Sequence, residues 1–419
     1  MEKFVIKGPC KVKGVVSVSG SKNAALPILA STLLFNKTVE IKNLPKVKDI
    51  ETMINLLRSL GSKISFSQNK RIVKIKNYKI KNFFASYSHV KTMRAGILVL
   101  GPLISRYGLA TVSMPGGCQI GVRPINYHLS GLRKLKMNYK IKKGYVHANA
   151  KKIIGSIIKF PKISVGATEN LIMAATLAKG KTTLKNCAIE PEIKDLVNFL
   201  KSAGAKIKWI GKRTLEIYGV KSLDSTSYSV MGDRIEAGTF CIASALTQGN
   251  LEIYGLKPEI INTEINLLKK IGAEIISKKN KIIVKGSKKI KNLKLLTTKE
   301  YPGFSTDLQA QFMVLLCKAK GRSIIKENIF ENRYLHCAEL RRLGANIIVR
   351  NKRAIILGGA NFEGAELMSS DLRASVALVL AAIAAKGKSI IHRIYHLSRG
   401  YENLDKKLKK IGVNIKKIS

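Results

Sequence analysis

The chain of 419 residues is too long for one ordinary domain, so we expect two globular units. Its formal net charge of +49 raises the possibility of a nucleic-acid-binding protein, whereas its 46% apolar content excludes a disordered chain. The longest uncharged apolar run, Ala374 to Ala385, is shorter than the roughly 20 residues of a membrane-spanning helix, and the start of the chain lacks a signal-peptide pattern. We therefore expect a cytoplasmic protein with no membrane contact.

The positive charge is distributed along the whole chain and is not gathered in one tail. Lysine runs such as Lys406 to Lys410 are interleaved with apolar residues, as on solvated helix faces, and a drift towards AT-rich codons would produce them. Trp209 is the only tryptophan, and few other aromatic residues are available for a base-stacking surface. We therefore expect no nucleic-acid partner, and we expect some of the cations to face an anionic small substrate.

The cysteines and histidines do not have the spacing of metal ligands. The six cysteines include no Cys-x-x-Cys pair, and the neighbours of most of them are apolar, as for reduced and buried thiols. The six histidines do not cluster either. We expect neither a metal site nor a cofactor.

In chain order, the apolar Phe4 to Ile6 predicts a short strand, and after it one pattern recurs six times. The pattern joins a leucine-containing helix end to a glycine and an apolar strand start. Glycine at this position accepts the left-handed conformation that ends a helix. The second copy has lysine instead, and the six positions are Gly61, Lys136, Gly204, Gly272, Gly344 and Gly412.

A second element precedes each copy of this pattern. A polar residue, an alanine and a small or polar residue open an apolar helix at five places, and the sixth place keeps the helix without the alanine. The openings are Asn23-Ala24-Ala25, Arg94-Ala95-Gly96, Ala167 to Asn170, Glu236-Ala237-Gly238, Gln309-Ala310-Gln311 and Arg373-Ala374-Ser375. Each copy therefore predicts helix, strand, helix and strand over about 70 residues, which is longer than the ~20–50-residue units of common solenoids.

Six units of this size indicate two α/β domains of pseudo-threefold symmetry, with the crossover near Tyr228 to Gly232. If the apolar helices are equivalent, the polar residues at their starts lie at equivalent corners. Because helix N-termini attract anions, an anion site is expected at these starts. The residues expected there are Lys22, Asn23, Arg94, Asp307 and Arg373.

The segment from Met114 to Pro124 contains three glycines and a cysteine, Cys118, and predicts an exposed, movable loop. The nearby Arg123 would favour the thiolate form of this cysteine, so a reactive thiol is one interpretation. The other is a glycine-rich turn with an incidental cysteine.

Asp307 lies in the first turn of a helix and is either a catalytic base or a capping residue. Arg333, Arg373 and Arg399 are candidate binding residues, although each alone is typical of a surface arginine. The sequence contains no Walker loop, Rossmann fingerprint or nucleophile elbow.

Four motifs together resemble the UDP-N-acetylglucosamine enolpyruvyl transferases, members of the enolpyruvyl transferase family. They are Ser19-Gly-Ser-Lys22-Asn23-Ala-Ala-Leu-Pro27, Pro115-Gly-Gly-Cys118, Phe304-Ser-Thr-Asp307-Leu-Gln-Ala-Gln311 and Tyr395-His-Leu-Ser-Arg399-Gly-Tyr-Glu402. The resemblance spans essentially the whole chain. It implies an α/β fold of two inside-out barrel-like domains, each built from three βαβαββ repeats, which agrees with the six copies counted independently.

The resemblance implies that residues 22–231 form one domain, which carries the Cys118 loop, and that residues 1–21 and 232–419 form the other. It places the active site in the cleft between them. The implied reaction transfers the enolpyruvyl group of phosphoenolpyruvate to the 3′-hydroxyl of UDP-N-acetylglucosamine by addition and elimination, and releases phosphate. This reaction is the first committed step of peptidoglycan synthesis.

The resemblance also implies roles for individual residues. Cys118 resembles the general acid and Asp307 the base near the sugar hydroxyl. The residues that resemble the phosphoenolpyruvate site are Lys22, Asn23, Arg123, Arg333, Arg373 and Arg399. The residues that resemble the nucleotide-sugar site are Asn23, Arg94, Arg123, Pro124, Ile125, Asn126, Tyr127, Lys162, Ile163, Ser164, Val165, Asp307 and Ile329.

One position departs from the family, and two other functions stay open. The family usually has aspartate where this chain has Asn126, so the uracil contact is expected to be rearranged. The sister enzyme enolpyruvylshikimate phosphate synthase shares the fold and the donor, but it would not need Cys118. A basic nucleic-acid-binding repeat protein would explain the net charge directly.

Overall fold

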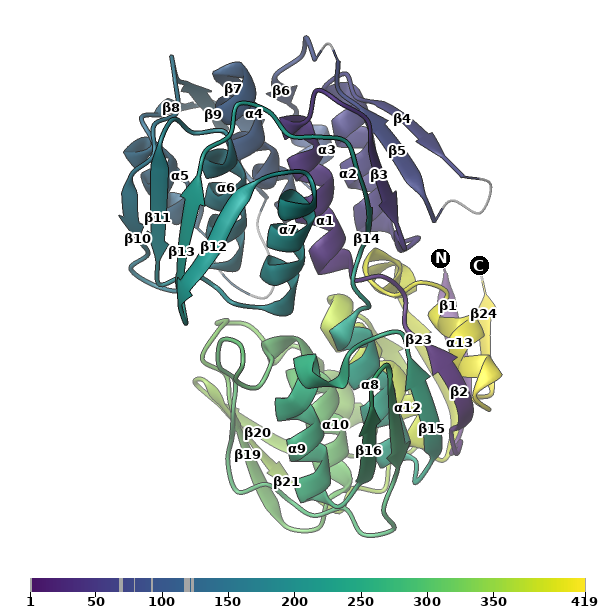
Figure 1. Ribbon diagram of the computed structural model, residues 1–419. Coiled ribbons are helices and arrows are strands. Elements are labelled where there is room, and N and C mark those ends of the chain that lie inside the picture. Colours follow the sequence, from purple (N-terminus) through teal and green to yellow (C-terminus); the bar gives the residue numbers. More distant parts are fainter. Residues whose placement is uncertain are drawn as a thin grey trace. The chain divides into compact units, whose positions relative to one another are not determined.

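The computed structural model describes residues 2–67, 71–78, 80–91, 93–116, 121 and 124–418. Within these residues the chain divides into two compact units. We call residues 2–19 and 232–418 the terminal unit, and residues 20–116 and 124–231 the inserted unit. Both ends of the chain therefore belong to the same unit, where they are marked in Figure 1.

The inserted unit contains three repeats. The first consists of α1 (Lys22–Ser31), the short 3-10 helix η1 (Thr32–Leu34), β3 (Val39–Lys42), α2 (Lys48–Ser59), β4 (Lys63–Phe66), β5 (Val73–Lys76) and the later strand β14 (Thr226–Ser229). The second consists of β6 (Phe84–Ala85), α3 (Tyr87–Val90), η2 (Arg94–Val99), α4 (Leu100–Tyr107), β7 (Leu109–Ser113), α5 (Asn126–Lys134), β8 (Asn138–Lys142) and β9 (Tyr145–Asn149). The third consists of β10 (Ile157–Lys159), α6 (Val165–Thr176), β11 (Lys181–Lys185), α7 (Pro191–Ser202), β12 (Lys206–Gly211) and β13 (Thr214–Tyr218).

The terminal unit also contains three repeats. The first consists of β2 (Lys13–Ser17), α8 (Arg234–Leu246), β15 (Asn250–Tyr254), η3 (Pro258–Ile261), α9 (Asn262–Ile271), β16 (Glu274–Lys278) and β17 (Lys281–Lys285). The second consists of β18 (Leu296–Thr297), η4 (Thr306–Leu308), α10 (Gln309–Lys318), β19 (Arg322–Lys326), α11 (His336–Arg342), β20 (Asn346–Arg350) and β21 (Arg353–Leu357). The third consists of β22 (Glu366–Met368), α12 (Leu372–Ala384), β23 (Gly387–His392), η5 (Ile394–Arg399), α13 (Leu404–Lys410), β24 (Ile415–Ile418) and the N-terminal strand β1 (Lys3–Gly8).

The six four-stranded sheets formed by the described residues share one topology. In each sheet, in the orders given below, the first two strands are parallel to each other and the third strand is antiparallel to both of its neighbours. Three of these strands, β14, β2 and β1, are far in the sequence from the strands with which they pair. The strand orders are β14-β3-β5-β4, β6-β7-β9-β8, β10-β11-β13-β12, β2-β15-β17-β16, β18-β19-β21-β20 and β22-β23-β1-β24. This shared topology confirms the βαβαββ repeats that the family resemblance implies, six in number as the sequence pattern predicts.

The N-terminal segment completes two sheets of the terminal unit. Strand β1 lies between β23 and β24 and is antiparallel to both, with Phe4 opposite Ile391 and Lys417. Strand β2 is parallel to β15. The strand predicted at Phe4 to Ile6 is thus confirmed, and it pairs with the last strands of the chain.

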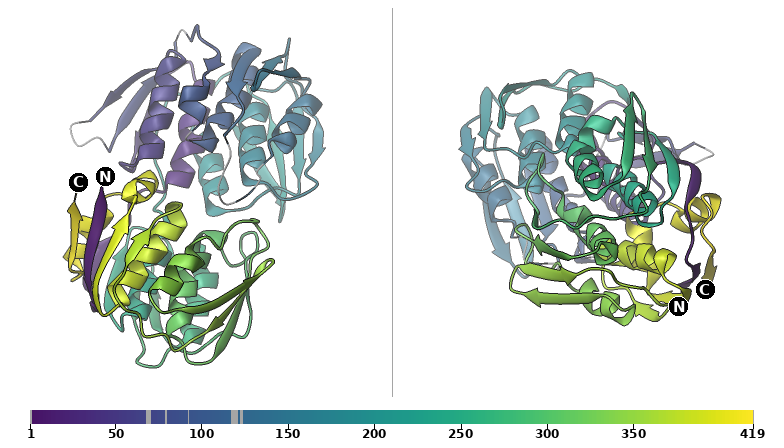
Figure 2. Two further views of the ribbon diagram at one scale, coloured as in Figure 1. Left: turned by 180° about the vertical axis from the view of Figure 1, so that it is seen from behind. Right: turned by 90° about the horizontal axis from the view of Figure 1, so that it is seen from below.

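The apolar helices occupy the middle of each unit, and the sheets lie on its outside (Figures 1 and 2). Helices α8, α10 and α12 contact one another in the terminal unit, and α1, η2 and α6 do so in the inserted unit. In α12 every residue from Arg373 to Ile383 is buried. Such a helix has no polar face, because other elements surround it on all sides. This arrangement is the inside-out α/β fold that the family resemblance implies.

The repeated helix ends have the left-handed backbone that the glycine pattern predicts. Among the described residues φ is positive at Gly61, Lys136, Gly204, Gly272, Gly344 and Gly412. Lys136 keeps the conformation with φ of 73° although it lacks the freedom of glycine. The second repeat therefore conserves the geometry of the helix end without its residue.

Candidate functional site

In the terminal unit, Asp307 forms ion pairs with two buried arginines. Its Oδ1 lies 2.6 Å from Nη2 of Arg333, and its Oδ2 lies 2.9 Å from Nη2 of Arg373. The two arginine side chains are 4% and 7% exposed, whereas that of Asp307 is 26% exposed. The carboxylate is thus the solvent-accessible member of a cluster in which two fixed cations face it.

The capping interpretation of Asp307 is wrong. The side chain of Ser305 accepts the hydrogen bond from the backbone N–H of Asp307 at the start of η4, so serine is the cap. The aspartate that caps a helix in this cluster is Asp371, which accepts from the N–H groups of Arg373 and Ala374 at the start of α12. Because the cap is satisfied by other groups, the Asp307 carboxylate is available to the arginines.

Arg373 is held by several negative or polar groups. Burial by itself lowers the pKa of its guanidinium, but the charge of Asp307, followed by Tyr401 and Asp233, outweighs that effect and raises the pKa above its ordinary value. The guanidinium also lies 5.9 Å from the ring centre of Tyr401, whose hydroxyl is 2.9 Å from Thr239 Oγ1. Arg373 therefore stays charged in a dry environment, which suits it to bind an anion.

Arg333, Arg399 and Ile329 are the other residues of the terminal unit that were predicted for the site. Arg333 also donates to the backbone carbonyl of Thr306, next to Asp307. Arg399 is half-buried at the end of η5. Ile329 is half-buried, and its N–H donates to the carboxylate of Glu327. Ion pairs bring Asp307, Arg333 and Arg373 together directly.

In the inserted unit, Lys22 forms an ion pair that the sequence does not predict. It is the first residue of α1, and its Nζ lies 3.0 Å from Oδ2 of Asp49 in α2. The two side chains are 13% and 7% exposed. Asn23 follows in the same first turn and is half-buried. Asp49 therefore orients an ammonium group at the N-terminus of a buried helix.

Arg94 begins η2 and donates through Nη1 to the backbone carbonyl of Gly116. Its charge lies close to His128, which is buried in α5. Burial and, to a lesser extent, the charge of Arg94 lower the pKa of His128 to about 4. Asn170 in α6 accepts from the N–H of Gly101 and donates to Nδ1 of His128 at 3.0 Å. A neutral histidine with its proton on Nε2 fits this network.

The remaining predicted nucleotide-sugar residues lie at helix starts of the inserted unit. Pro124 and Asn126 are exposed, Ile125 is buried and Tyr127 is half-buried, and Asn126 begins α5. Ser164 caps α6 by accepting from the N–H of Ala167, while Lys162 and Val165 are exposed and Ile163 is half-buried. Cys118 and Arg123, the predicted acid and a phosphate ligand, lie outside the described residues.

The described cysteines differ in exposure. Cys187, Cys241, Cys317 and Cys337 are buried as expected, and burial raises the pKa of each thiol to about 12. Cys10, which lies between Pro9 and Lys11, is half-buried, whereas a buried thiol was expected for each cysteine except Cys118. The four buried thiols are poor nucleophiles at neutral pH.

Sequence reasoning missed Asp49, Tyr401 and the His128–Asn170 pair. Asp49 stands 27 residues from Lys22, and Tyr401 stands 28 residues from Arg373. No local spacing links such residues. The repeat offered the only usable signal, because it places the second helix of a unit beside the first.

Comparison with known proteins decides the family. Residues 6–408 match the model of the EPSP synthase (3-phosphoshikimate 1-carboxyvinyltransferase) family. The chain belongs to this family. A relative from Pelagibacter ubique (strain HTCC1062), "UDP-N-acetylglucosamine 1-carboxyvinyltransferase", is 64% identical over 100% of both chains. A protein of the same name from Geotalea uraniireducens (strain Rf4) is 49% identical, again over 100% of both chains.

Among solved structures, the enolpyruvyl transferase NikO from Streptomyces tendae superposes with a TM-score of 0.91. The match covers 99% of this chain and 98% of that one, at 23% identity. This likeness shows the shared enolpyruvyl transferase fold. No described helix is long and apolar enough to cross a membrane, and the described residues contain no cluster of potential metal ligands.

Proposed function

We propose that the chain transfers the enolpyruvyl group of phosphoenolpyruvate to the 3′-hydroxyl of UDP-N-acetylglucosamine and releases phosphate. The observation that carries the proposal is the 64% identity, over the whole of both chains, to a protein named for this reaction class. The family shown by residues 6–408 also contains the shikimate enzyme, so the acceptor is the part of the proposal that most needs a test. By this proposal the chain acts in peptidoglycan synthesis in the cytoplasm.

The cations of both units suit the donor. Phosphoenolpyruvate carries about three negative charges, and preorganised guanidinium and ammonium groups stabilise charge that moves during addition and elimination. Arg333 and Arg373 are buried and held by Asp307, and Lys22 is held by Asp49, so none of the three needs a large reorganisation. By this proposal Arg333 and Arg373 bind the carboxylate, while Lys22, Arg123 and Arg399 bind the phosphate and Asn23 lies beside them.

Proton transfer requires an acid and a base. Asp307 is the proposed base, because its carboxylate is partly accessible to solvent and is positioned by two arginines. Cys118 is the proposed acid that protonates the methylene carbon. The sugar nucleotide is proposed to contact Arg94, residues 123–127, residues 162–165 and Ile329. That both units act on one substrate pair, in a cleft between them, stays a prediction.

Phosphate release tests the proposal. We expect release only when phosphoenolpyruvate and UDP-N-acetylglucosamine are both present, and none when shikimate 3-phosphate replaces the nucleotide sugar. Asp307→Ala should abolish release. Asp224→Ala, which removes a 71%-exposed carboxylate, is the matched control and should leave it unchanged. Release with shikimate 3-phosphate instead would identify the sister activity.

Alkylation by fosfomycin, an inhibitor of the resembled enzymes, tests Cys118 separately. The Cys118→Ala variant should lose the covalent label detected by mass spectrometry. Cys10→Ser is the control, because Cys10 is the half-buried thiol among the described cysteines, and labelling should persist in it. A label that remains on Cys118→Ala would contradict the assignment.

A further inference from the structure

The second repeat of the inserted unit has an unusual charge distribution. No aspartate or glutamate occurs between Glu51 and Glu169, although lysine and arginine recur throughout that stretch. Codon drift accounts for many lysines, but it does not explain why one part of the chain lacks acids. The sheet β6-β7-β9-β8 lies wholly within this stretch.

The neighbouring sheets of the inserted unit have acids that neutralise their lysines. In the first repeat, Glu40 pairs with Lys42 and Lys74. In the third repeat, Glu216 pairs with Lys181 and also lies opposite Lys208 on the adjacent strand. At the position of the second repeat that corresponds to Lys208, Lys140 lies opposite His147. The second sheet therefore presents cations without carboxylate partners in its own strands.

The outer face of this sheet also presents aromatic rings to solvent. Phe84 is 45% exposed, and its ring stacks on Tyr145 with centroids 5.2 Å apart and planes 25° apart. The ring of Tyr145 lies 6.3 Å from that of the exposed His147. The register places Lys140 beside His147 and Lys142 beside Tyr145. The rings and the cations thus occupy neighbouring positions on one face.

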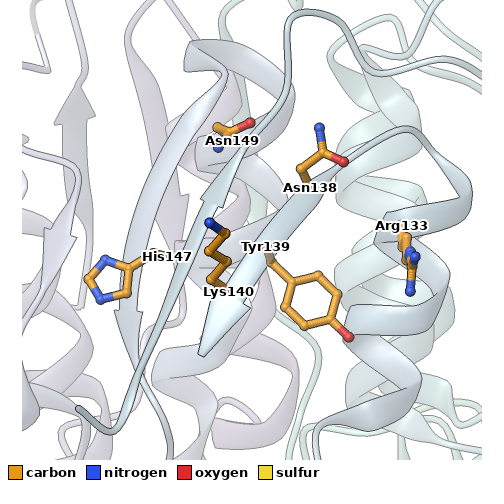
Figure 3. A pocket seen from close by; sticks show the side chains of 6 residues that line it. All are labelled: Arg133, Asn138, Tyr139, Lys140, His147 and Asn149. Atoms are coloured by element: carbon orange, nitrogen blue, oxygen red, sulfur yellow. The ribbon is translucent and has the colours of Figure 1, made fainter. Parts of the chain in front are cut away.

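Hydrogen-bonding groups continue this face to the edge strand β8. An open hollow of about 630 Å³ is lined by Arg133, Asn138, Tyr139, Lys140, His147 and Asn149 (Figure 3). Each of these side chains carries a hydrogen-bonding group, and two are fixed cations. Asn138 lies opposite Asn149 in the register, so two amides are adjacent there.

We propose that this face, defined by Phe84, Tyr145, His147, Lys140 and Lys142, binds single-stranded nucleic acid. Exposed aromatic rings on a four-stranded sheet are a common platform on which unpaired bases stack, and flanking lysines contact the phosphates. Amides such as those of Asn138 and Asn149 suit the polar edges of bases better than they suit lipid acyl chains. Aromatic residues are few in the chain as a whole, but on this face three rings lie together beside cations.

Fluorescence anisotropy of a labelled oligothymidylate tests the proposal with the full-length protein. An oligonucleotide of about 20 nucleotides exceeds the ~4–16-nucleotide sites of OB-fold domains that bind single strands. Affinity should fall as KCl rises from about 50 to 200 mM. Lys140→Gln with Lys142→Gln should reduce the slope of log affinity against log salt by about 1.4, since each phosphate contact contributes about 0.7. Phe84→Leu and Tyr145→Leu should each weaken binding at least about fivefold and leave the slope unchanged.

The matched control is Lys206→Gln with Lys208→Gln on the equivalent strand of the third repeat. It removes the same charge from a sheet that contains Glu216, so the salt slope should match the parent. Equal losses in the two double variants, or ring variants that bind like the parent, would overturn the proposal. So would tighter, ring-dependent binding to phosphatidylglycerol vesicles than to the oligonucleotide. Thermal melts check folding, and Phe84→Leu, at an exposed site, keeps the test valid if Tyr145→Leu does not fold.

Discussion

The Oδ2 atom of Asp307 lies 2.9 Å from Nη2 of Arg373, the second residue of the central helix of the next repeat. Arg333 binds the other oxygen of the same carboxylate. The proposed base and two proposed substrate ligands are therefore linked before any substrate arrives. A change in Asp307 must affect both chemistry and the stability of the terminal unit.

Asp307→Asn should separate these effects. Removal of the general base should lower the rate of phosphate release by at least about a hundredfold. Removal of the charge leaves two buried arginines without their shared partner. We therefore expect the free energy of unfolding to fall by about 1–3 kcal/mol. This is at or below the range for a fully buried ion pair, because Asp307 is partly exposed. Steady-state kinetics and urea unfolding measure the two effects. Wild-type activity in this variant would contradict the assignment of the base.

Asp49→Asn tests whether Asp49 orients Lys22. The amide keeps the size of the carboxylate but loses the charge that holds the ammonium group 3.0 Å away. We expect the KM for phosphoenolpyruvate to rise about tenfold, with a smaller change for the nucleotide sugar. Glu51→Gln is the control, since its carboxylate pairs with the exposed Lys48 on the surface of the same helix. A uniform loss of kcat with KM unchanged would argue against an orienting role.

His128 makes stability depend on pH in a defined window. Its pKa is about 4 in the folded chain, below the ordinary value of 6.5, because burial and Arg94 disfavour the charged ring. The unfolded chain therefore binds a proton that the folded chain does not, and stability falls as pH falls from about 6.5 to 4. His128→Gln should remove up to about 2 kcal/mol of this loss at pH 5. Urea unfolding at pH 5 and 7.5 measures the difference, and parallel pH profiles would contradict it.

Lys407 compensates a buried carboxylate. Burial raises the pKa of Glu236 to about 7 against the opposing effect of Lys407, whose Nζ lies 2.5 Å from the carboxylate and 2.8 Å from Ser19 Oγ. In the Lys407→Met variant, Glu236 is protonated at pH 5 and needs no cationic partner. At pH 8 the ionised carboxylate lacks the lysine that stabilises it. We expect little change in unfolding free energy at pH 5 and a loss of about 1–3 kcal/mol at pH 8.

The double variant Glu236→Gln with Lys407→Met is the control for this pH dependence. It has no carboxylate to ionise at this site, so the difference from Glu236→Gln alone should be the same at both values of pH. A loss in Lys407→Met that is equally large at pH 5 would show that packing, and not charge, is the cause.

Lys136→Gly should stabilise the inserted unit. Lysine at a φ of 73° occupies a conformation that costs a residue with a side chain about 1–2 kcal/mol. Glycine avoids this strain but gives the unfolded chain more freedom, so we expect a net gain of about 0.5–1 kcal/mol. Gly204→Ala, at the equivalent helix end of the third repeat, should destabilise by a similar amount. Thermal unfolding measures both.

The helix end at Lys136 also shows why the fold could be predicted from the sequence. Five glycines in the same local pattern revealed the repeat. The remaining copy was recognised from its place between Gly61 and Gly204, although it has Lys136 instead of glycine. Side-chain contacts between residues far apart in the sequence could be predicted less well. The ion pair of Lys22 with Asp49 and the contact of Arg373 with Tyr401 depend on helices that pack only after folding, so no local pattern marks them.

For the candidate site, local sequence identified the candidate binding residues better than the residues that pair with them. Asp307, Arg333 and Arg373 were chosen individually, and the structure brings the three together. The helix start alone could not distinguish a cap from a base at Asp307, because both interpretations need a carboxylate in the first turn. The structure excludes the capping role, because the hydroxyl of Ser305 accepts the hydrogen bond at this helix start.

Strand β1 has a consequence for how the protein is made. It pairs with β23 and β24, which are synthesised after the whole inserted unit. At about 5–20 residues per second, the first strand waits roughly 20–80 s for its neighbours, while the inserted unit is already complete. A nascent chain halted before β23 would therefore contain a complete inserted unit, an unpaired strand β1 and an incomplete terminal unit.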